Sequence, residues 1–216
     1  ETPESDEFKA FYLELQDFLE FKVDSIKIDE TGEYGDDVLD GLRKLGAFGI
    51  KIPKKYGGLG FTQAEYCKAV ELIGSYDGSL VALVSAHLSI GVPTPVKLFG
   101  TDYQKETYLT RCAAGAISAF ALTEPDVGSD PARLATKYEI TPEGDYILSG
   151  EKLWITNGTC AELMVVMARS VETQKISAFI VEMDWEGISI PHRCRFMGLK
   201  ALQNGVILFD KVRVPK

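Results

Sequence analysis

The chain has 216 residues, of which 45% are hydrophobic and 25% are charged, as is ordinary for a soluble globular protein with one large or two small domains. Its net charge of −9 argues against broad nucleic-acid or anionic-membrane binding, and no signal peptide or apolar run as long as a membrane span is found. Four cysteines without a CxxC pair and only two histidines predict neither a metal site nor a disulfide framework, and they suggest a reducing compartment.

The first half of the sequence predicts helices. Over 7–23, apolar residues recur at steps of three and four, the pattern of one buried helical stripe. A short helix is expected over 36–46, ending near a glycine. Pro53 and several glycines make 49–60 a loop.

Three further helices are predicted from capping residues. Thr62, with Glu65 three residues later, forms a capping-box pattern for a helix that runs to Ser75. Ser79 is the expected N-cap of a helix over 80–90, apolar nearly all round. Thr101 with Gln104 repeats the capping-box pattern before a helix that ends ahead of Gly115.

From residue 117 onward, the periodicity becomes that of short strands. The expected strands cover 117–122, 136–140, 146–149, 153–155, 163–168, 176–181, 188–190 and 206–209. Turns are predicted at 142–145 and at Asn157-Gly158. The fold class is therefore α+β: an α-helical domain over 1–116, followed over 117–216 by a small antiparallel β-barrel or sandwich.

A loop over 120–130, FALTEPDVGSD, leaves the first of these strands. Pro125 cannot continue strand pairing, and Gly128 allows close approach of another molecule. Hydroxyls and unpaired backbone N–H groups at such a bend suit a heteroaromatic edge or a phosphate. A capped surface turn is the alternative.

A second stretch, EKLWITNG over 151–158, also runs from an apolar strand into a polar turn. It contains Trp154, one of only two tryptophans. A tryptophan at such a place would ordinarily fill a core.

Together the two stretches resemble the acyl-CoA dehydrogenase family, whose central domain carries a TEPxxGSD loop and, about thirty residues on, a W-I-T/S-N turn. The resemblance covers nearly the whole chain: 45–60 is similar to the family's GxxGLxxPxxxGGxG region, 99–109 to its GTxxQKxxYLP segment, and 198–215 to its GxR…FxxVxVP end. The helical half looks most like the long- and very-long-chain members. The family continues into a four-helix C-terminal domain after this point, and the chain begins at Glu1 without an initiator Met, so we expect a piece of a longer protein.

The resemblance implies a flavoprotein that binds FAD and a fatty acyl-CoA, and that converts the acyl-CoA to trans-2-enoyl-CoA in fatty acid β-oxidation. The implied cofactor-binding residues are Phe120, Leu122, Thr123, Gly128, Ser129, Trp154, Ile155 and Thr156. The strand end at 120–123 would border the isoalloxazine, Trp154 would cover one face of it, and the Thr156 hydroxyl would lie near N5. Gly128 and Ser129 would lie by the diphosphate, and Ser129 would also contact the CoA portion of the substrate.

Some positions are ambiguous under this resemblance. Val127 and Arg133 stand where the family usually has small residues; the arginine is either a solvated charge or a phosphate ligand. Leu83, Ile90 and Val92 are candidates to contact the acyl tail, although core packing is the more common role of such residues.

No catalytic base is assigned within 1–216, because the family supplies a Glu from its C-terminal domain. We expect the in-chain candidates to serve other roles: Glu124 and Asp130 as turn caps, Glu151 as an exposed side chain, His87 in the core and His192 in a turn. The chain alone is therefore expected to be inactive.

Other functions and settings stay open. The alternatives are an acyl-CoA oxidase of the same fold, and a non-catalytic module that binds acyl-CoA or a partner without flavin. The implied partners are the acyl-CoA substrate, an electron-transfer flavoprotein as acceptor, and further copies of the protein in a homodimer or homotetramer. A bacterial cytoplasm is expected, with the mitochondrial matrix as the alternative.

Overall fold

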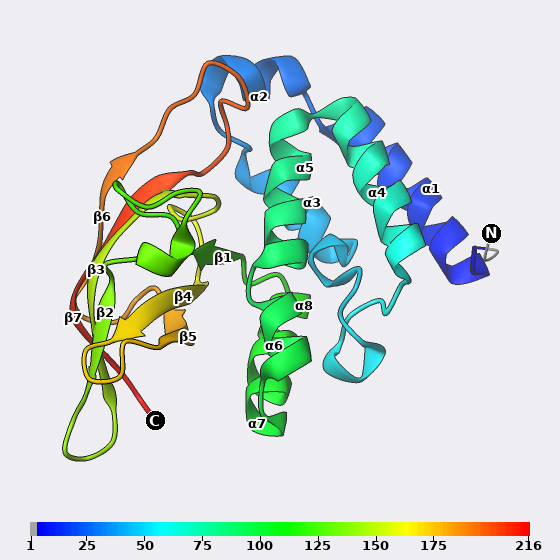
Figure 1. The fold of residues 1–216 in the computed structure, drawn as a ribbon. Helices are drawn as coiled ribbons and strands as arrows, with labels where there is room; N and C mark the ends of the chain where they lie inside the picture. Colours follow the sequence, from blue (N-terminus) through cyan, green and yellow to red (C-terminus); the bar gives the residue numbers. More distant parts are fainter. Residues whose placement is uncertain (1–3) are drawn as a thin grey trace. The chain divides into compact units, whose positions relative to one another are not determined.

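The computed structural model describes residues 4–216, which separate into two compact units (Figure 1). The first, here called the helical unit, runs to Ala116 and also includes Phe196–Leu202. The second, the sheet unit, consists of Ile117–Arg195 and Gln203–Lys216. The chain therefore returns to the helical unit between its last two strands.

The helical unit is built from short helices joined by tight turns. They are α1 (Asp6–Lys22), α2 (Ser25–Thr31), α3 (Asp36–Lys44), η1 (Ala47–Gly49), η2 (Lys54–Tyr56), α4 (Gln63–Tyr76), α5 (Gly78–Ser85), η3 (Ala86–Ile90), α6 (Pro93–Phe99), α7 (Asp102–Gln104), η4 (Lys105–Leu109) and α8 (Thr110–Ala113). The helix predicted over 7–23 is confirmed as α1. Its stripe of Phe8, Phe11, Leu15 and Leu19 is buried, and α1 packs against α4, which packs against α5 (Figure 1). Burying each such side chain stabilises the fold by roughly 1.5–3 kcal/mol.

Two of the three helix caps predicted from the sequence are present, and one is misplaced. The capping boxes at Thr62 and Thr101 are both present, as predicted. The predicted N-cap at Ser79 is wrong, since α5 already begins at Gly78 and the Asp77 carboxylate accepts the Leu80 N–H at 2.7 Å. A carboxylate caps a helix as well as a hydroxyl does, so Asp77 is the N-cap, two residues before the predicted one.

The longest apolar helical stretch, Gly78–Phe99, also corrects the sequence-based expectation about membrane spans. It covers 22 residues with a mean hydropathy of 1.5, which is long and apolar enough by composition to cross a membrane. However, 61% of its qualifying window is buried, as in the core helix of a folded unit. The stretch is built from α5, η3 and α6, and each of the three contributes buried side chains.

The sheet unit is one seven-stranded sheet. Its strands are β1 (Ser118–Ala121), β2 (Lys137–Ile140), β3 (Tyr146–Ile155), β4 (Leu163–Ser170), β5 (Ile176–Glu182), β6 (Ile188–Arg193) and β7 (Gly205–Val214). They pair in the order β1-β4-β2-β3-β7-β6, with β5 on the other edge of β4 (Figure 1). The helical half followed by a curled β half confirms the predicted fold class.

The sheet differs from the expected antiparallel barrel in the direction of two strand pairs. β1 and β2 each pair parallel with β4, whereas the other pairs are antiparallel. The sheet is therefore mixed. Alternating apolar residues predict a strand but not the direction of its partner, which depends on the path of the intervening loops.

Several strands are longer than predicted, among them β7, which covers Gly205–Val214 instead of 206–209. The expected strands 146–149 and 153–155 are one strand, β3, whose pairing to β7 shifts register between Leu148 and Gly150 and again between Lys152 and Ile155. β6 continues through Pro191 to Arg193, so His192 lies in a strand and not in the predicted turn. A register shift between Ser189 and His192 accommodates the proline, which has no N–H to donate.

Candidate functional site

The two loops singled out by the sequence lie side by side in the sheet unit. The Leu153 N–H donates to the Thr123 carbonyl at 2.9 Å, and the Lys152 ammonium donates to the Leu122 carbonyl at 3.1 Å. These bonds join the end of β1 to the end of β3. The loop after β1 and the turn after β3 therefore form one candidate site.

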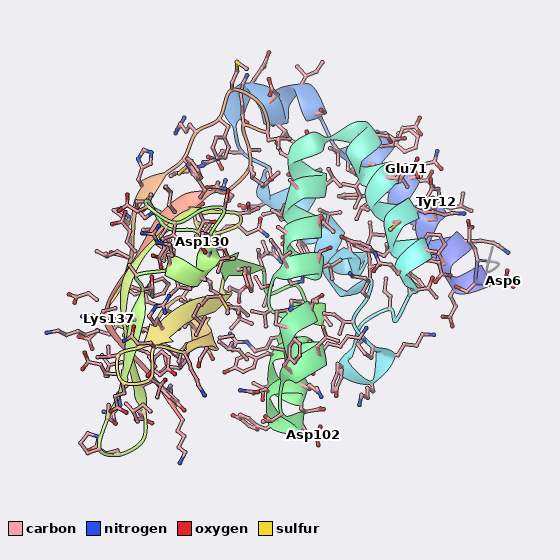
Figure 2. All side chains as sticks on the ribbon, in the orientation of Figure 1. Asp6, Tyr12, Glu71, Asp102, Asp130 and Lys137 are labelled. Atoms are coloured by element: carbon pink, nitrogen blue, oxygen red, sulfur yellow. The ribbon has the colours of Figure 1, made fainter. Side chains whose placement is uncertain are left out.

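The loop after β1 closes into a tight turn and then opens. Glu124 and Val127 exchange backbone hydrogen bonds of 3.0 and 3.1 Å, so Val127 closes this turn with its side chain buried. Gly128 and Ser129 are exposed, and a Cβ on Gly128 would meet nothing within 4 Å. Asp130 stands at the end of the loop, beside the short helix η5 (Pro131–Arg133) (Figure 2).

The backbone N–H groups of Gly128 and Ser129 have the properties of an anion site. Within residues 4–216, neither N–H has a recorded protein acceptor. Successive N–H groups with open space before them bind phosphate oxygens. The stretch thus offers both the N–H donors and the open space that a diphosphate needs.

A buried ion pair supports the loop from beneath. The Lys152 ammonium lies 2.8 Å from the Glu124 carboxylate, and their side chains are 0% and 4% exposed. The same carboxylate accepts the backbone N–H groups of Ala135 at 2.5 Å and Thr136 at 2.9 Å. Glu124 therefore ties the loop after β1 both to the start of β2 and to β3.

The pKa values of this pair reflect burial and hydrogen bonding. Burial alone would raise the pKa of Glu124, but bonds from Lys152, Thr136 and the Ala135 backbone together lower it. Burial lowers the pKa of Lys152, and the neighbouring carboxylate opposes this shift. Each group therefore stabilises the charged form of the other.

The turn after β3 presents an exposed tryptophan in a strained conformation. The Trp154 side chain is 60% exposed, and its backbone has a φ of 56°, in the left-handed region. Such a conformation is costly for a large side chain and tends to occur at functional sites. The core-filling alternative does not hold for Trp154, whose indole is available to cover a planar ligand.

Thr156 and Asn204 meet behind this turn. The Asn204 amide donates to the Trp154 carbonyl at 3.2 Å and to the Thr156 hydroxyl at 3.4 Å. Asn204 is 4% exposed, whereas Thr156 is half-buried. Sequence reasoning missed both Asn204 and Lys152, because each acts through a partner far along the chain.

The remaining predicted cofactor residues occupy three environments. Phe120, Leu122 and Thr123 are half-buried at the end of β1. Ile155 is 2% exposed and belongs to the core of the sheet unit, so it can offer a ligand only its backbone. Gly128 and Ser129 are exposed in the loop, and Arg133 is exposed beyond them.

The residues considered for the acyl tail divide in the same way. Leu83 and Val92 are fully buried in the helical unit, as core residues are, and Ile90 is 51% exposed. Ile90 is therefore the only one of these three with substantial exposed surface.

Glu151 and His87 have the surroundings expected of them, but the other candidate acids and bases do not. The Glu124 carboxylate is held by Lys152 and by the segment before β2 instead of capping a turn, Asp130 makes no side-chain cap bond to η5, and His192 lies in a strand. Asp130 and Glu151 are exposed, as is His192 on β6. His87 is fully buried, its Nε2 lies 3.0 Å from the Phe48 carbonyl, and burial lowers its pKa to about 4. Within residues 4–216, no three His, Cys, Asp or Glu side chains gather as metal ligands would, and all four cysteines are thiols.

Comparison with known proteins follows the same division of the chain. Residues 5–116 match the family model "Acyl-CoA dehydrogenase, N-terminal domain", and residues 119–212 match "Acyl-CoA dehydrogenase, middle domain". The probable acyl-CoA dehydrogenase FadE10 of Mycobacterium tuberculosis is 50% identical over 213 residues, which are 96% of this chain and 33% of that protein. The mitochondrial very long-chain specific acyl-CoA dehydrogenase of Homo sapiens is 39% identical over 92% of this chain and 32% of its own length.

A solved structure agrees with these relatives. An acyl-CoA dehydrogenase of Bacillus anthracis complexed with FAD is similar with a TM-score of 0.89 at 33% identity, over 99% of this chain and 37% of that one. The chain spans about a third of the length of the curated relatives that it matches.

Proposed function

Because the chain belongs to the acyl-CoA dehydrogenase family, we propose that the protein that contains it is an FAD-dependent dehydrogenase of fatty acyl-CoA thioesters, forming trans-2-enoyl-CoA. One observation carries this proposal: the exposed Trp154, the Thr156 hydroxyl and the open N–H groups of Gly128 and Ser129 all lie on the two adjoining loops. An aromatic wall, a hydroxyl and an anion site are what a flavin dinucleotide requires.

The residues of the sheet unit would hold FAD by its two ends. The main chain at Leu122 and Thr123, with the Thr123 hydroxyl, would bond the pyrimidine edge of the ring, and the Trp154 indole would cover one face and exclude water. Gly128 and Ser129 would bind the diphosphate through their N–H groups, and Ser129 would also contact CoA. When bound, FAD accepts the hydrogen that leaves Cβ of the acyl chain.

The remaining parts of the reaction are assigned to the whole protein. The exposed carboxylates Asp130 and Glu151 have no feature that marks a base, and Glu124 is bound to Lys152. We therefore propose that the base that removes the Cα proton is a Glu outside this chain, and that these 216 residues alone do not turn over. The similarity to a very long-chain enzyme supports a long acyl substrate.

The electron acceptor, the oligomeric state and the cellular compartment are also proposals. An electron-transfer flavoprotein is the proposed acceptor, and a homodimer or homotetramer the proposed assembly. The bacterial relative is more similar than the human mitochondrial one, which favours a bacterial cytoplasm over the mitochondrial matrix.

Anaerobic reduction of the full-length protein tests this function. The purified protein is expected to carry a yellow flavin chromophore, which a saturated long-chain acyl-CoA bleaches while trans-2-enoyl-CoA appears. Trp154→Ala is expected to weaken flavin binding by about tenfold or more, because it removes the ring's cover. The matched control is Trp185→Ala, which truncates the other tryptophan, a half-buried residue beside the sheet core.

The same preparation separates the alternatives. Rapid release of hydrogen peroxide during aerobic turnover would mean an oxidase. A full-length protein that binds acyl-CoA but never carries flavin would instead be a non-catalytic module, and the proposed dehydrogenase function would be wrong.

A further inference from the structure

Asn204 lies immediately before β7 and reaches across to the turn after β3. Its own carbonyl accepts the Cys194 N–H at 2.8 Å, which holds its backbone in place. Its side chain is 4% exposed and contacts two atoms of the turn, the Trp154 carbonyl and the Thr156 hydroxyl. One amide therefore reaches both residues proposed to face the flavin ring.

The orientation of this amide is determined by its partners. The Trp154 carbonyl is only an acceptor, so the nitrogen of Asn204 must face it at 3.2 Å. The same nitrogen lies 3.4 Å from the Thr156 hydroxyl oxygen, whereas the amide oxygen is buried and has no hydrogen-bond partner in the described chain. Asn204 therefore donates to Thr156 and does not accept from it.

This direction determines where the Thr156 hydroxyl hydrogen can point. A hydroxyl has one hydrogen and two lone pairs, and here a lone pair is occupied by the Asn204 N–H. Within residues 4–216, no protein acceptor is recorded for the hydroxyl hydrogen, and Thr156 is half-buried. The hydrogen is thus left to be donated away from Asn204.

The second bond acts on Trp154. Its φ of 56° is unfavourable for a bulky L residue, so other contacts must stabilise this conformation. The Asn204 bond to its carbonyl is one such contact.

We propose that Asn204 is a positioning residue of the flavin site, which orients the Thr156 hydroxyl as a hydrogen-bond donor toward the ring and holds Trp154 in its left-handed conformation. This inference rests on the proposed function. Asn204 acts through Thr156 and Trp154 and does not itself contact the flavin.

A double-mutant cycle on the full-length holoprotein tests the proposal. Thr156→Val is expected to shift the visible flavin spectrum and to change the equilibrium constant for flavin reduction by about threefold to tenfold, or about 15–30 mV for a two-electron couple. Asn204→Ala should shift both in the same direction. In the Thr156→Val background, most of the Asn204→Ala effect should vanish, because the hydroxyl it orients is gone.

Two further variants sharpen the cycle. Asn204→Asp keeps the side-chain shape but replaces the donor with a carboxylate that accepts the Thr156 hydrogen, so it should reproduce the Thr156→Val shift. Gln203→Ala is the matched control, because it truncates the neighbouring amide, whose oxygen accepts the Thr159 hydroxyl at 2.7 Å. It should leave the flavin spectrum and potential unchanged.

Either of two results would overturn the proposal: Asn204 variants with a wild-type flavin spectrum and potential, or effects of Asn204→Ala and Thr156→Val that simply add. A neutron structure of the wild-type protein decides the matter even where the variants fail to fold or the protein carries no flavin. It must place the Thr156 hydroxyl deuterium away from Asn204, and a deuterium directed at Asn204 would refute the inference. Absence of flavin from the wild type would refute the proposed function separately.

Discussion

At the scale of single residues, the buried ion pair of Lys152 and Glu124 joins the loop after β1 to β3. Removing two charges from water is costly, and the pair is tolerated because the carboxylate also accepts two backbone N–H groups. Replacing one partner leaves the other as an uncompensated buried charge. The pair therefore holds the loop after β1 against β3 at the place where the flavin ring is proposed to bind.

Lys152→Met is expected to lower the free energy of unfolding by about 3–5 kcal/mol, because Glu124 keeps its charge but loses its buried partner. Denaturant unfolding of the protein measures this loss. Lys137→Met is the matched control, since Lys137 is an exposed residue on β2 (Figure 2), and it should cost less than about 1 kcal/mol.

The double variant Lys152→Met with Glu124→Gln should recover part of the lost stability, because the second change removes the unpaired charge. If Lys152→Met were no more destabilising than Lys137→Met, the buried pair would not have the role assigned to it.

At the scale of elements, Glu65 joins the beginnings of two helices. Its carboxylate accepts from the Thr62 N–H and hydroxyl, which closes the capping box of α4, and from the Ser5 N–H at 2.9 Å and hydroxyl at 2.7 Å, at the N-cap of α1. Burial by itself would raise the pKa of Glu65, but these four bonds outweigh it and lower the pKa to about 2. The carboxylate thus joins α1 to α4 most strongly when it is ionised.

The pH dependence follows from this lowered pKa. A carboxyl whose pKa falls on folding contributes stability above its unfolded value of about 4.5 and loses it as pH falls toward 2. Glu65→Gln should therefore lower the free energy of unfolding by about 1–2 kcal/mol at pH 6 and by little at pH 2.

Denaturant midpoints between pH 6 and pH 2 measure this difference. Glu71→Gln, an exposed position on the same helix (Figure 2), is the control and should behave as the wild type at every pH. A constant difference between Glu65→Gln and the wild type across this range would contradict the assignment.

At the scale of the whole molecule, the helical unit is not continuous in sequence. The segment Phe196–Leu202, between β6 and β7, belongs to it. Lys200 pairs with Asp29 on α2 at 2.8 Å, and the Leu199 side chain lies against Gly78 at the start of α5. A segment that lies between two strands in the sequence therefore helps to complete the helical unit.

Replacing residues 196–202 with a Gly-Ser segment of equal length should destabilise α2 and the start of α5. Their amide hydrogens should exchange about tenfold faster, corresponding to about 1.4 kcal/mol of local stability. Amides of β4 and β5 should keep their protection. As a control, replacing the exposed turn at 171–174 in the same way should leave the exchange of α2 and α5 unchanged. Unchanged exchange in α2 and α5 would show that the segment contributes nothing to the helical unit.

By itself, the sequence determined the local features of this protein. The buried stripe of α1, the capping boxes at Thr62 and Thr101, and the turn at Asn157-Gly158 could all be predicted, because each depends on residues within a few positions of one another. The two loops could be singled out for the same reason.

Only the tertiary structure decided what those loops meet. Glu124 and Lys152 are 28 residues apart, and Asn204 lies 48 residues from Thr156. The parallel pairing of β1 and β2 with β4 and the return of 196–202 to the helical unit are likewise non-local. Such contacts form only when the whole chain brings distant segments together, and no short stretch of sequence contains the information that specifies them.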